Sequence, residues 1–119
     1  MEKRDIGYFG ENIAADYLKA KGYRILERNF SCRFGEADII ATENGYLVFA
    51  EVKLRKDSRF SEAREFVDRK KQERIILTAK YYLMKHGTDL PVRFDVIEIY
   101  SSEVRNGKPR IEHIENAFE

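Results

Sequence analysis

The chain has 119 residues, of which 43% are hydrophobic and 36% charged, so it carries enough apolar side chains for a folded core. Its net charge of +1 excludes a uniformly basic nucleic-acid coat protein but allows a local basic patch. The single cysteine excludes an internal disulfide, and the longest apolar run, residues 46–50, is far too short to span a membrane. We therefore expect one domain over residues 1–119, outside the membrane and in the cytoplasm.

Two helices are predicted. The first covers residues 6–21, with Asp5 as its N-cap and Gly22 at its end. The second covers residues 67–85, with an apolar stripe that includes Ile76 and Ala79. Between the strands and this second helix, residues 55–65 are polar, charged and without periodicity, which predicts a loop.

Strands are predicted on both sides of that second helix. Three precede it, over residues 23–30, 37–42 and 46–54, and a fourth follows over residues 92–100. Residues 31–35 are expected to form a turn, and residues 111–118 a short strand or a tail. Helix, three strands, helix and strand in this order indicate a mixed sheet flanked by helices, an α/β or α+β fold.

The second and third strands are joined by Asn44-Gly45, the strongest short signal for a tight hairpin. With a two-residue turn there, Asp38 falls directly opposite Glu51, and Glu36 falls opposite Lys53. Cross-strand partners have Cβ atoms ~4.5–5.5 Å apart. The turn alone therefore predicts two adjacent carboxylates with a third carboxylate and an ammonium beside them.

Such an arrangement is costly, because both faces of this hairpin are apolar and like charges repel across a sheet. A divalent metal ion would compensate the acids, and hard oxygen ligands suit Mg²⁺ or Mn²⁺. The alternative is a structural salt-bridge cluster in which Lys53 neutralises one acid. The turn register, the apolar flanks and the like-charge contact together favour the metal site, with the Val52 carbonyl as a further ligand.

The residues Asp38 and Glu51-Val52-Lys53 resemble the PD-(D/E)xK signature of restriction-endonuclease-like nucleases. The wider pattern, with Gly7 and Glu11 in the first helix, residues 35–40 (GEADII) and residues 48–55 (VFAEVKLR), resembles the YraN / UPF0102 family of small bacterial proteins and, more distantly, archaeal Holliday-junction resolvases. The resemblance implies a restriction-endonuclease-like αβββαβ core and a metal-dependent phosphodiesterase site. It makes Asp38 and Glu51 metal ligands and Lys53 the catalytic lysine. Ala37 replaces the proline that often precedes the motif aspartate.

Other residues are weaker candidates for this site. Glu11 is expected to be a metal ligand or a water-bridged site residue, because Gly7 and Gly10 remove bulk beside it. Glu36 is either an acid paired with Lys53 or an additional ligand. Gln72 lies on the stripe that faces the sheet, where it reaches the site or satisfies a backbone group. Of the two histidines, His113 is expected to be an exposed strand residue without a ligand partner.

The charge distribution favours a polyanion. Residues 53–74 contain nine Lys and Arg against five Asp and Glu, so the positive excess begins at the motif lysine. We expect Arg55, Lys56 and Arg59, on the predicted loop, to bind the phosphate backbone of a nucleic acid.

These features predict a Mg²⁺- or Mn²⁺-dependent nuclease that acts on DNA, including branched or structured forms, with Glu11, Asp38, Glu51 and Lys53 as its catalytic residues. RNA is the other substrate that phosphodiester chemistry allows, and cutting both strands would require a homodimer or two successive events. The rival interpretation is a non-catalytic nucleic-acid-binding module in DNA uptake, repair or recombination.

Overall fold

The computed structural model describes residues 3–56 and 68–118, with side chains from Phe9 onward. In chain order the elements are α1 (Lys3–Ala20), β1 (Arg24–Cys32), β2 (Gly35–Glu43), β3 (Tyr46–Arg55), α2 (Arg69–His86), β4 (Val92–Arg105) and β5 (Lys108–Phe118). The strands form one mixed sheet in the order β1-β2-β3-β4-β5, in which β3 and β4 are parallel and the other neighbours antiparallel. The predicted mixed sheet flanked by helices is therefore confirmed as an α+β fold.

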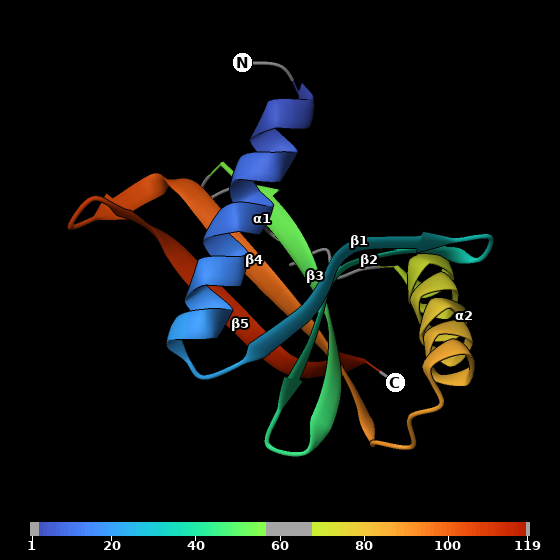
Figure 1. Ribbon diagram of the computed structural model, residues 1–119. Coiled ribbons are helices and arrows are strands. Elements are labelled where there is room, and N and C mark those ends of the chain that lie inside the picture. Colours follow the sequence, from blue (N-terminus) through green and yellow to red (C-terminus); the bar gives the residue numbers. More distant parts are fainter. Residues whose placement is uncertain (1–2, 57–67, 119) are drawn as a thin grey trace.

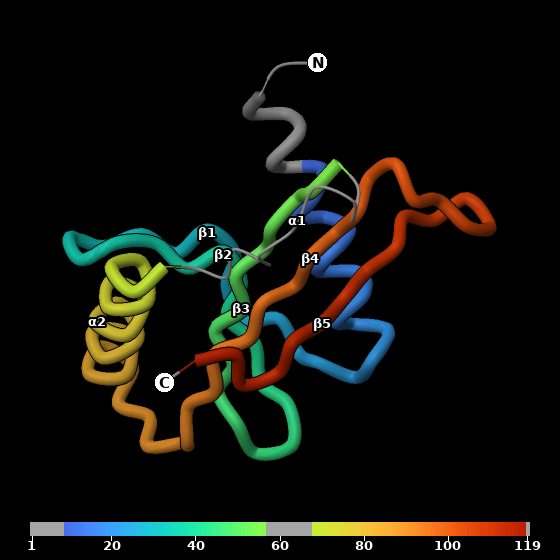
Figure 2. The backbone as a smooth tube through the Cα atoms, turned by 180° about the vertical axis from the view of Figure 1, so that it is seen from behind, coloured from blue at the N-terminus to red at the C-terminus, as the bar shows by residue number. Residues whose placement is uncertain are grey.

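The two helices cover opposite faces of the sheet. Figure 1 looks onto α1, and Figure 2, from behind, brings α2 to the front. On β3, Leu47 and Phe49 pack in the cluster beneath α2, whereas Val48 and Ala50 pack beneath α1. This alternation explains the apolar run at residues 46–50, since a strand covered on both faces has no polar side.

The Asn44-Gly45 turn forms as predicted. Both residues have positive φ angles, 53° and 81°, which the type I′ hairpin turn requires. The ladder that follows pairs Glu43 with Tyr46 and continues to the pair Ile39 and Ala50, in the predicted register.

A second tight turn, at Asn106-Gly107 (φ 54° and 76°), was not predicted. Because of it, β4 continues to Arg105 instead of ending at residue 100, and residues 108–118 form a full strand, not a short strand or tail. The other expected turn, over residues 31–35, shortens to Arg33 and Phe34, because β1 reaches Cys32 and β2 begins at Gly35.

The helix boundaries also differ. Helix α1 begins at Lys3, so Asp5 lies inside its first turn and does not cap it. Helix α2 begins after residue 67, with Asp68 as its N-cap, because the Asp68 side chain accepts a hydrogen bond from the Lys71 backbone N–H at 2.9 Å. Within the described segments, neither helix is long and apolar enough to cross a membrane.

Candidate active site

A fork in the sheet lies where the two motif acids meet. The β2–β3 ladder ends at Ile39 and Ala50. Beyond that point β2 stays paired with β1, since Glu36 pairs with Ser31, and β3 stays paired with β4, since Glu51 pairs with Val96. The two central strands therefore part at Asp38 and Glu51.

Side chains replace the backbone ladder at the fork. The Val52 N–H donates to Asp38 Oδ2 at 2.8 Å, and the Asp38 N–H lies 3.4 Å from Glu51 Oε2. These contacts satisfy backbone donors that would otherwise lose their partners where the strands separate. Asp38 and Glu51 are thus near neighbours as predicted, but they are held by side-chain contacts and not as a ladder pair.

A backbone irregularity in β1 accompanies the fork. Arg28 pairs with Ile39 and Phe30 with Ala37, so Asn29 lies opposite Asp38. Asn29 has φ 54°, a left-handed conformation that asparagine tolerates better than most residues. Residues two positions apart on a regular strand share one face of the sheet. Here, however, Ile39 packs beneath α1 and Ala37 packs beneath α2. Strand β2 therefore turns about its own axis at Asp38.

The acidic pair is electrostatically costly. Glu51 is 3% exposed, and burial, together with the neighbouring charge of Asp38, raises its pKa to about 8. Burial and the charge of Glu36 likewise raise the pKa of Asp38, against the lowering effects of the Val52 hydrogen bond and Lys71. Lys71 compensates in part, with its Nζ 3.7 Å from Glu51 Oε1, but its side chain is 52% exposed. The site therefore favours a further positive charge.

The acids line a cavity of ≈ 500 Å³ between the fork and the first turns of α2. Its basic wall comes from α2, and its lining residues are Gly35, Glu36, Asp38, Glu51, Asp68, Lys70, Lys71, Arg74 and Ile75. Gly35 brings α2 close to β2, because a Cβ there would lie 3.3 Å from Thr78 Oγ1. Three cations of α2 thus line the same cavity as buried Glu51 and half-buried Asp38.

Lys53 and Val52 follow Glu51 on β3 and lie on opposite faces of the sheet. Lys53 lies two residues after Glu51 on β3, so it shares the α2-facing side of the sheet. The Val52 side chain packs beneath α1. Its N–H points into the fork toward Asp38, and the carbonyl of a strand residue points to the same edge as its N–H.

Glu11 lies near the acidic pair but on the other side of the sheet. Burial raises its pKa, a hydrogen bond from Asn29 lowers it, and the charges of Asp38 and Glu36 raise it further. Glu11 Oε1 is buried without a hydrogen-bond partner among the described residues, and Arg28 Nη2 lies 3.9 Å away. A water or a cation would satisfy this oxygen.

Several predicted contacts have a different form. Glu36 is not the ladder partner of Lys53, because the strands part before reaching that pair; Lys53 pairs with Glu98 of β4. Gln72 is half-buried on α2 and is not among the described residues that line the cavity, whereas Lys71 is.

The predicted phosphate-binding loop also changes. Arg55 is the last residue of β3, and its Nε lies 2.8 Å from Oε2 of Glu98, which is 1% exposed. Lys56 is exposed, and its phosphate binding stays a prediction. Arg59 and the rest of residues 57–65 lie outside the described residues.

A second cluster of potential ligands lies on β4 and β5. Asp95, His113 and Glu115 offer ligand atoms within 4.8 Å of one another. However, Arg93 bonds both Asp95 oxygens at 3.0 Å, and His113 Nε2 lies 2.7 Å from Asp95 Oδ2. Burial would raise the pKa of Asp95, but the hydrogen bonds from His113 and Arg93 hold it below its ordinary value. The Arg93 guanidinium thus occupies the place that a metal ion would take beside Asp95. The cluster ties β5 to β4 through the contact between His113 and Asp95.

His113 is therefore not the exposed residue that its position indicated. Its side chain is 3% exposed and contacts Asp95. The sequence pattern also missed Asn29, Lys71 and Glu98 as neighbours of the site. Asn29 could have been found, because asparagine is disfavoured in strands and this one lies within a predicted strand. The excess of basic residues at the start of α2 was a signal for Lys71.

Comparison with known proteins places this chain among close relatives. Residues 10–99 match the profile of a family described as "Uncharacterised protein family UPF0102". The chain is similar to a UPF0102 protein of Clostridioides difficile (strain 630), with 44% identity over 99% of this chain and 100% of that protein. A UPF0102 protein of Thermodesulfovibrio yellowstonii is 45% identical over 99% of each chain. One of Caldanaerobacter subterraneus is 41% identical over 99% of this chain and 98% of that protein.

Proposed function

This chain belongs to the uncharacterised protein family UPF0102, and we propose that it is a metal-dependent nuclease that hydrolyses phosphodiester bonds in DNA. The observation that carries the proposal is the contact between Asp38 and Glu51 at the fork, with both pKa values raised. A structural role does not require a buried acid, Glu51, to lie against a second, half-buried acid, Asp38. The PD-(D/E)xK resemblance of the motif agrees with this proposal.

The donor set fits Mg²⁺ or Mn²⁺. Asp38 and Glu51 supply hard carboxylate oxygens from two rigid strands, and the Val52 carbonyl faces the same fork. The raised pKa values support this fit, because a divalent cation would replace the incomplete compensation by Lys71. Glu11, whose Oε1 is buried without a hydrogen-bond partner among the described residues, would contribute to this set through a water.

When bound, such a metal lowers the pKa of a coordinated water and stabilises the charge on the reacting phosphate. Lys53, on the same face as Glu51, positions or deprotonates the attacking water, or neutralises the charge that develops. Asp38 is held in place by its hydrogen bond to the Val52 N–H.

The basic wall of the cavity binds the phosphates beside the scissile bond. Lys70, Lys71 and Arg74 line the cavity and come from the first turns of α2. The positive end of the helix dipole points the same way, which favours an anion. The ion pair between Lys71 and Glu51 is long at 3.7 Å, so Lys71 can exchange that carboxylate for a phosphate. Hydrolysis of both strands of a duplex would use two copies of the chain or two successive events.

A non-catalytic nucleic-acid-binding module is the rival function. The basic wall and exposed Lys56 suit either function. Binding alone would gain nothing from this acidic pair, which repels phosphate. Asp38 and Glu51 therefore favour catalysis.

Cleavage of a panel of nucleic acids in Mg²⁺ or Mn²⁺ tests the proposal. The substrates are single-stranded, duplex, flap and four-way-junction DNA, with RNA of the same sequences alongside. We expect metal-dependent cleavage of at least one DNA by the wild type and none by Asp38→Asn, Glu51→Gln or Lys53→Met. Binding without cleavage under all conditions would favour the rival function, and equal cleavage by the three variants would exclude this site.

A further inference from the structure

The β4–β5 hairpin extends beyond the rest of the sheet. Strand β3 ends at Arg55, which pairs with Tyr100, whereas β4 continues to Arg105 and turns back at Asn106-Gly107. Both views show this hairpin reaching away from the body of the molecule (Figures 1 and 2). We name residues 101–110 the ribbon.

The ribbon leaves the sheet at a defined point. The Ser102 N–H donates to the Lys56 carbonyl at 2.9 Å, which ties the base of the ribbon to the end of β3. Its two strands shift in register between the pairs Tyr100–Arg110 and Val104–Pro109. Such a bulge bends a two-stranded unit and increases its twist. The ribbon is therefore a bent arm with a fixed base.

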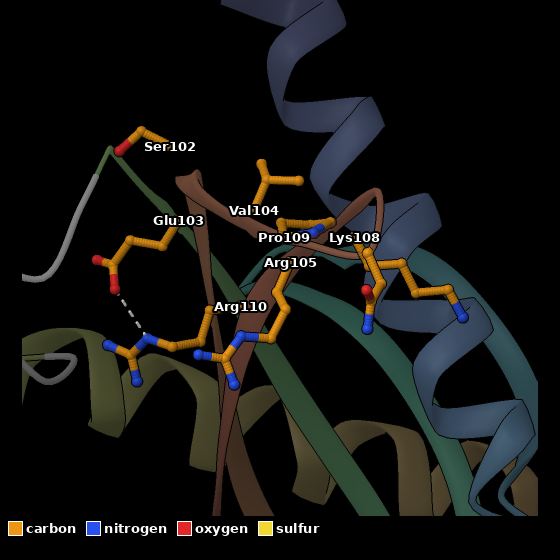
Figure 3. A pocket seen from close by; sticks show the side chains of 8 residues that line it. Ser102, Glu103, Val104, Arg105, Lys108, Pro109 and Arg110 are labelled. Atoms are coloured by element: carbon orange, nitrogen blue, oxygen red, sulfur yellow. Dashed lines mark hydrogen bonds and ion pairs between the residues drawn. The ribbon is translucent and has the colours of Figure 1, made fainter.

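Exposed cations and one exposed apolar residue lie on this arm. Arg105, Lys108 and Arg110 are exposed, and they line a groove of ≈ 700 Å³ together with Val104, whose exposed fraction is 58%. Figure 3 shows Arg105 and Arg110 extending to the same side of the ribbon, while Lys108 points over α1. Arg110 is held by Glu103 at 3.1 Å and lies 4.1 Å from the centre of the Tyr100 ring.

The arginine side of the ribbon continues the face that carries the active site. Lys53 pairs with Glu98, and Tyr100 pairs with Arg110. Since Glu98 and Tyr100 are two residues apart on β4, the side chains of Lys53 and Arg110 lie on the same face of the sheet. A nucleic acid whose reacting phosphate lies beside Lys53 would therefore extend along this face toward Arg110 and then toward Arg105.

We propose that the ribbon is a binding arm for duplex DNA, which enters the major groove of the double helix on one side of the bond to be cut. The proposal rests on the proposed nuclease function and names its substrate as DNA with a double-helical segment. A two-stranded β-ribbon fits the major groove of B-form DNA, whereas the major groove of A-form RNA is too deep and narrow for side chains to read. Arg105 and Lys108 reach the phosphates on either side, and Val104 contacts base edges such as the thymine methyl group.

Equilibrium binding in EDTA tests this arm, because no strand is cut without metal. The variant Arg105→Ala/Lys108→Ala removes two exposed cations, and Lys80→Ala/Lys85→Ala removes two exposed cations from α2 as a matched control. Fluorescence anisotropy measures the affinity for duplex DNA, duplex RNA and single-stranded DNA at several salt concentrations. Thermal melting verifies that both variants fold.

We expect the ribbon variant to bind duplex DNA roughly tenfold more weakly, with a salt slope lower by about 1.8, because each phosphate contact contributes about 0.9. The control should keep the wild-type slope. A ribbon variant with wild-type affinity and slope would overturn the proposal, as would an equal loss for single strands or for duplex RNA. A wild type that does not bind duplex DNA would also overturn it. Since these results need no catalysis, they are distinct from a failure of the metal site or of cleavage.

Discussion

Asp38 Oδ2 accepts a hydrogen bond from the backbone N–H of Val52, with 2.8 Å between oxygen and nitrogen, across the point where their two strands part. This hydrogen bond holds a carboxylate in the fork beside Glu51, at the cost of like-charge repulsion between two acids. The same bond makes the structural and electrostatic roles of Asp38 separable by mutation.

The first prediction separates those roles with two variants. At about pH 8.5, where Glu51 is largely ionised, metal-free Asp38→Asn should be at least as stable as the wild type. The amide oxygen still accepts the hydrogen bond from the Val52 N–H, while the repulsion between the two acids disappears. Asp38→Ala should lose ~1–3 kcal/mol of unfolding free energy, because the Val52 N–H is left without an acceptor. Urea denaturation measures both. A loss of ~3–5 kcal/mol in Asp38→Asn would identify Asp38 as the structural partner of a cation, in place of a metal ligand.

The second prediction concerns pH. The pKa of Glu51 is about 8 in the folded chain against an ordinary value of 4.5. Below pH 4.5 both the folded and the unfolded chain hold this proton, so its stabilising contribution is complete. As the pH rises toward 8, the unfolded chain releases the proton that the folded chain retains, and metal-free stability falls.

Glu51→Gln should flatten this slope, and Mn²⁺ should reduce the wild-type loss, because the metal binds the ionised acids. Denaturation midpoints measured at several pH values provide the comparison. A wild type whose metal-free stability rises over this range would show that Glu51 is ionised and well compensated in the folded chain.

The third prediction concerns Lys71, which competes with a metal for Glu51. Lys71→Gln should bind Mn²⁺ about twofold to fivefold more tightly at about pH 8.5, as expected for the loss of one partly exposed cation. The same variant should bind DNA more weakly, because a cation is lost from the cavity wall. Lys80→Gln, further along α2, serves as the control. Weaker metal binding by Lys71→Gln would mean that this lysine supports the metal site.

The fourth prediction distinguishes Arg55 from its neighbour Lys56. Arg55→Ala leaves the buried Glu98 carboxylate without the guanidinium that bonds it at 2.8 Å and should cost ~3–5 kcal/mol of stability. Lys56→Ala should change stability by less than about 0.5 kcal/mol while lowering the salt slope of DNA binding by about 0.9. If Arg55→Ala is as stable as the wild type, the Arg55–Glu98 ion pair is not a structural element and Arg55 can serve the substrate.

Much of the site could be predicted because one local signal specified it. Asn44-Gly45 sets the register of its own hairpin, and that register carries Asp38 to Glu51. The parting of the strands could not be predicted in the same way. It depends on the Asp38 carboxylate, which replaces a backbone carbonyl as the acceptor for the Val52 N–H. The alternation of apolar residues along a strand does not indicate such a replacement.

Contacts made by distant segments were also beyond the sequence pattern. Lys71 reaches Glu51 because α2 packs against β2 where Thr78 lies close to Gly35, a contact between segments distant in sequence. Glu98 meets Arg55 through a parallel pairing whose register no tight turn specifies. His113 is buried because β5 is a full strand, which the unrecognised Asn106-Gly107 turn makes possible.

Calorimetric titration of Mn²⁺ at about pH 8.5, where Glu51 is largely ionised, tests the central claim most directly. The proteins are the wild type, Asp38→Asn, Glu51→Gln and His113→Ala, of which the last disrupts the other group of potential ligands. We predict saturable binding by the wild type and by His113→Ala, and a loss of roughly tenfold or more in affinity in both acid variants. Wild-type affinity in Asp38→Asn and Glu51→Gln, or a loss confined to His113→Ala, would contradict the assignment of the metal to the fork.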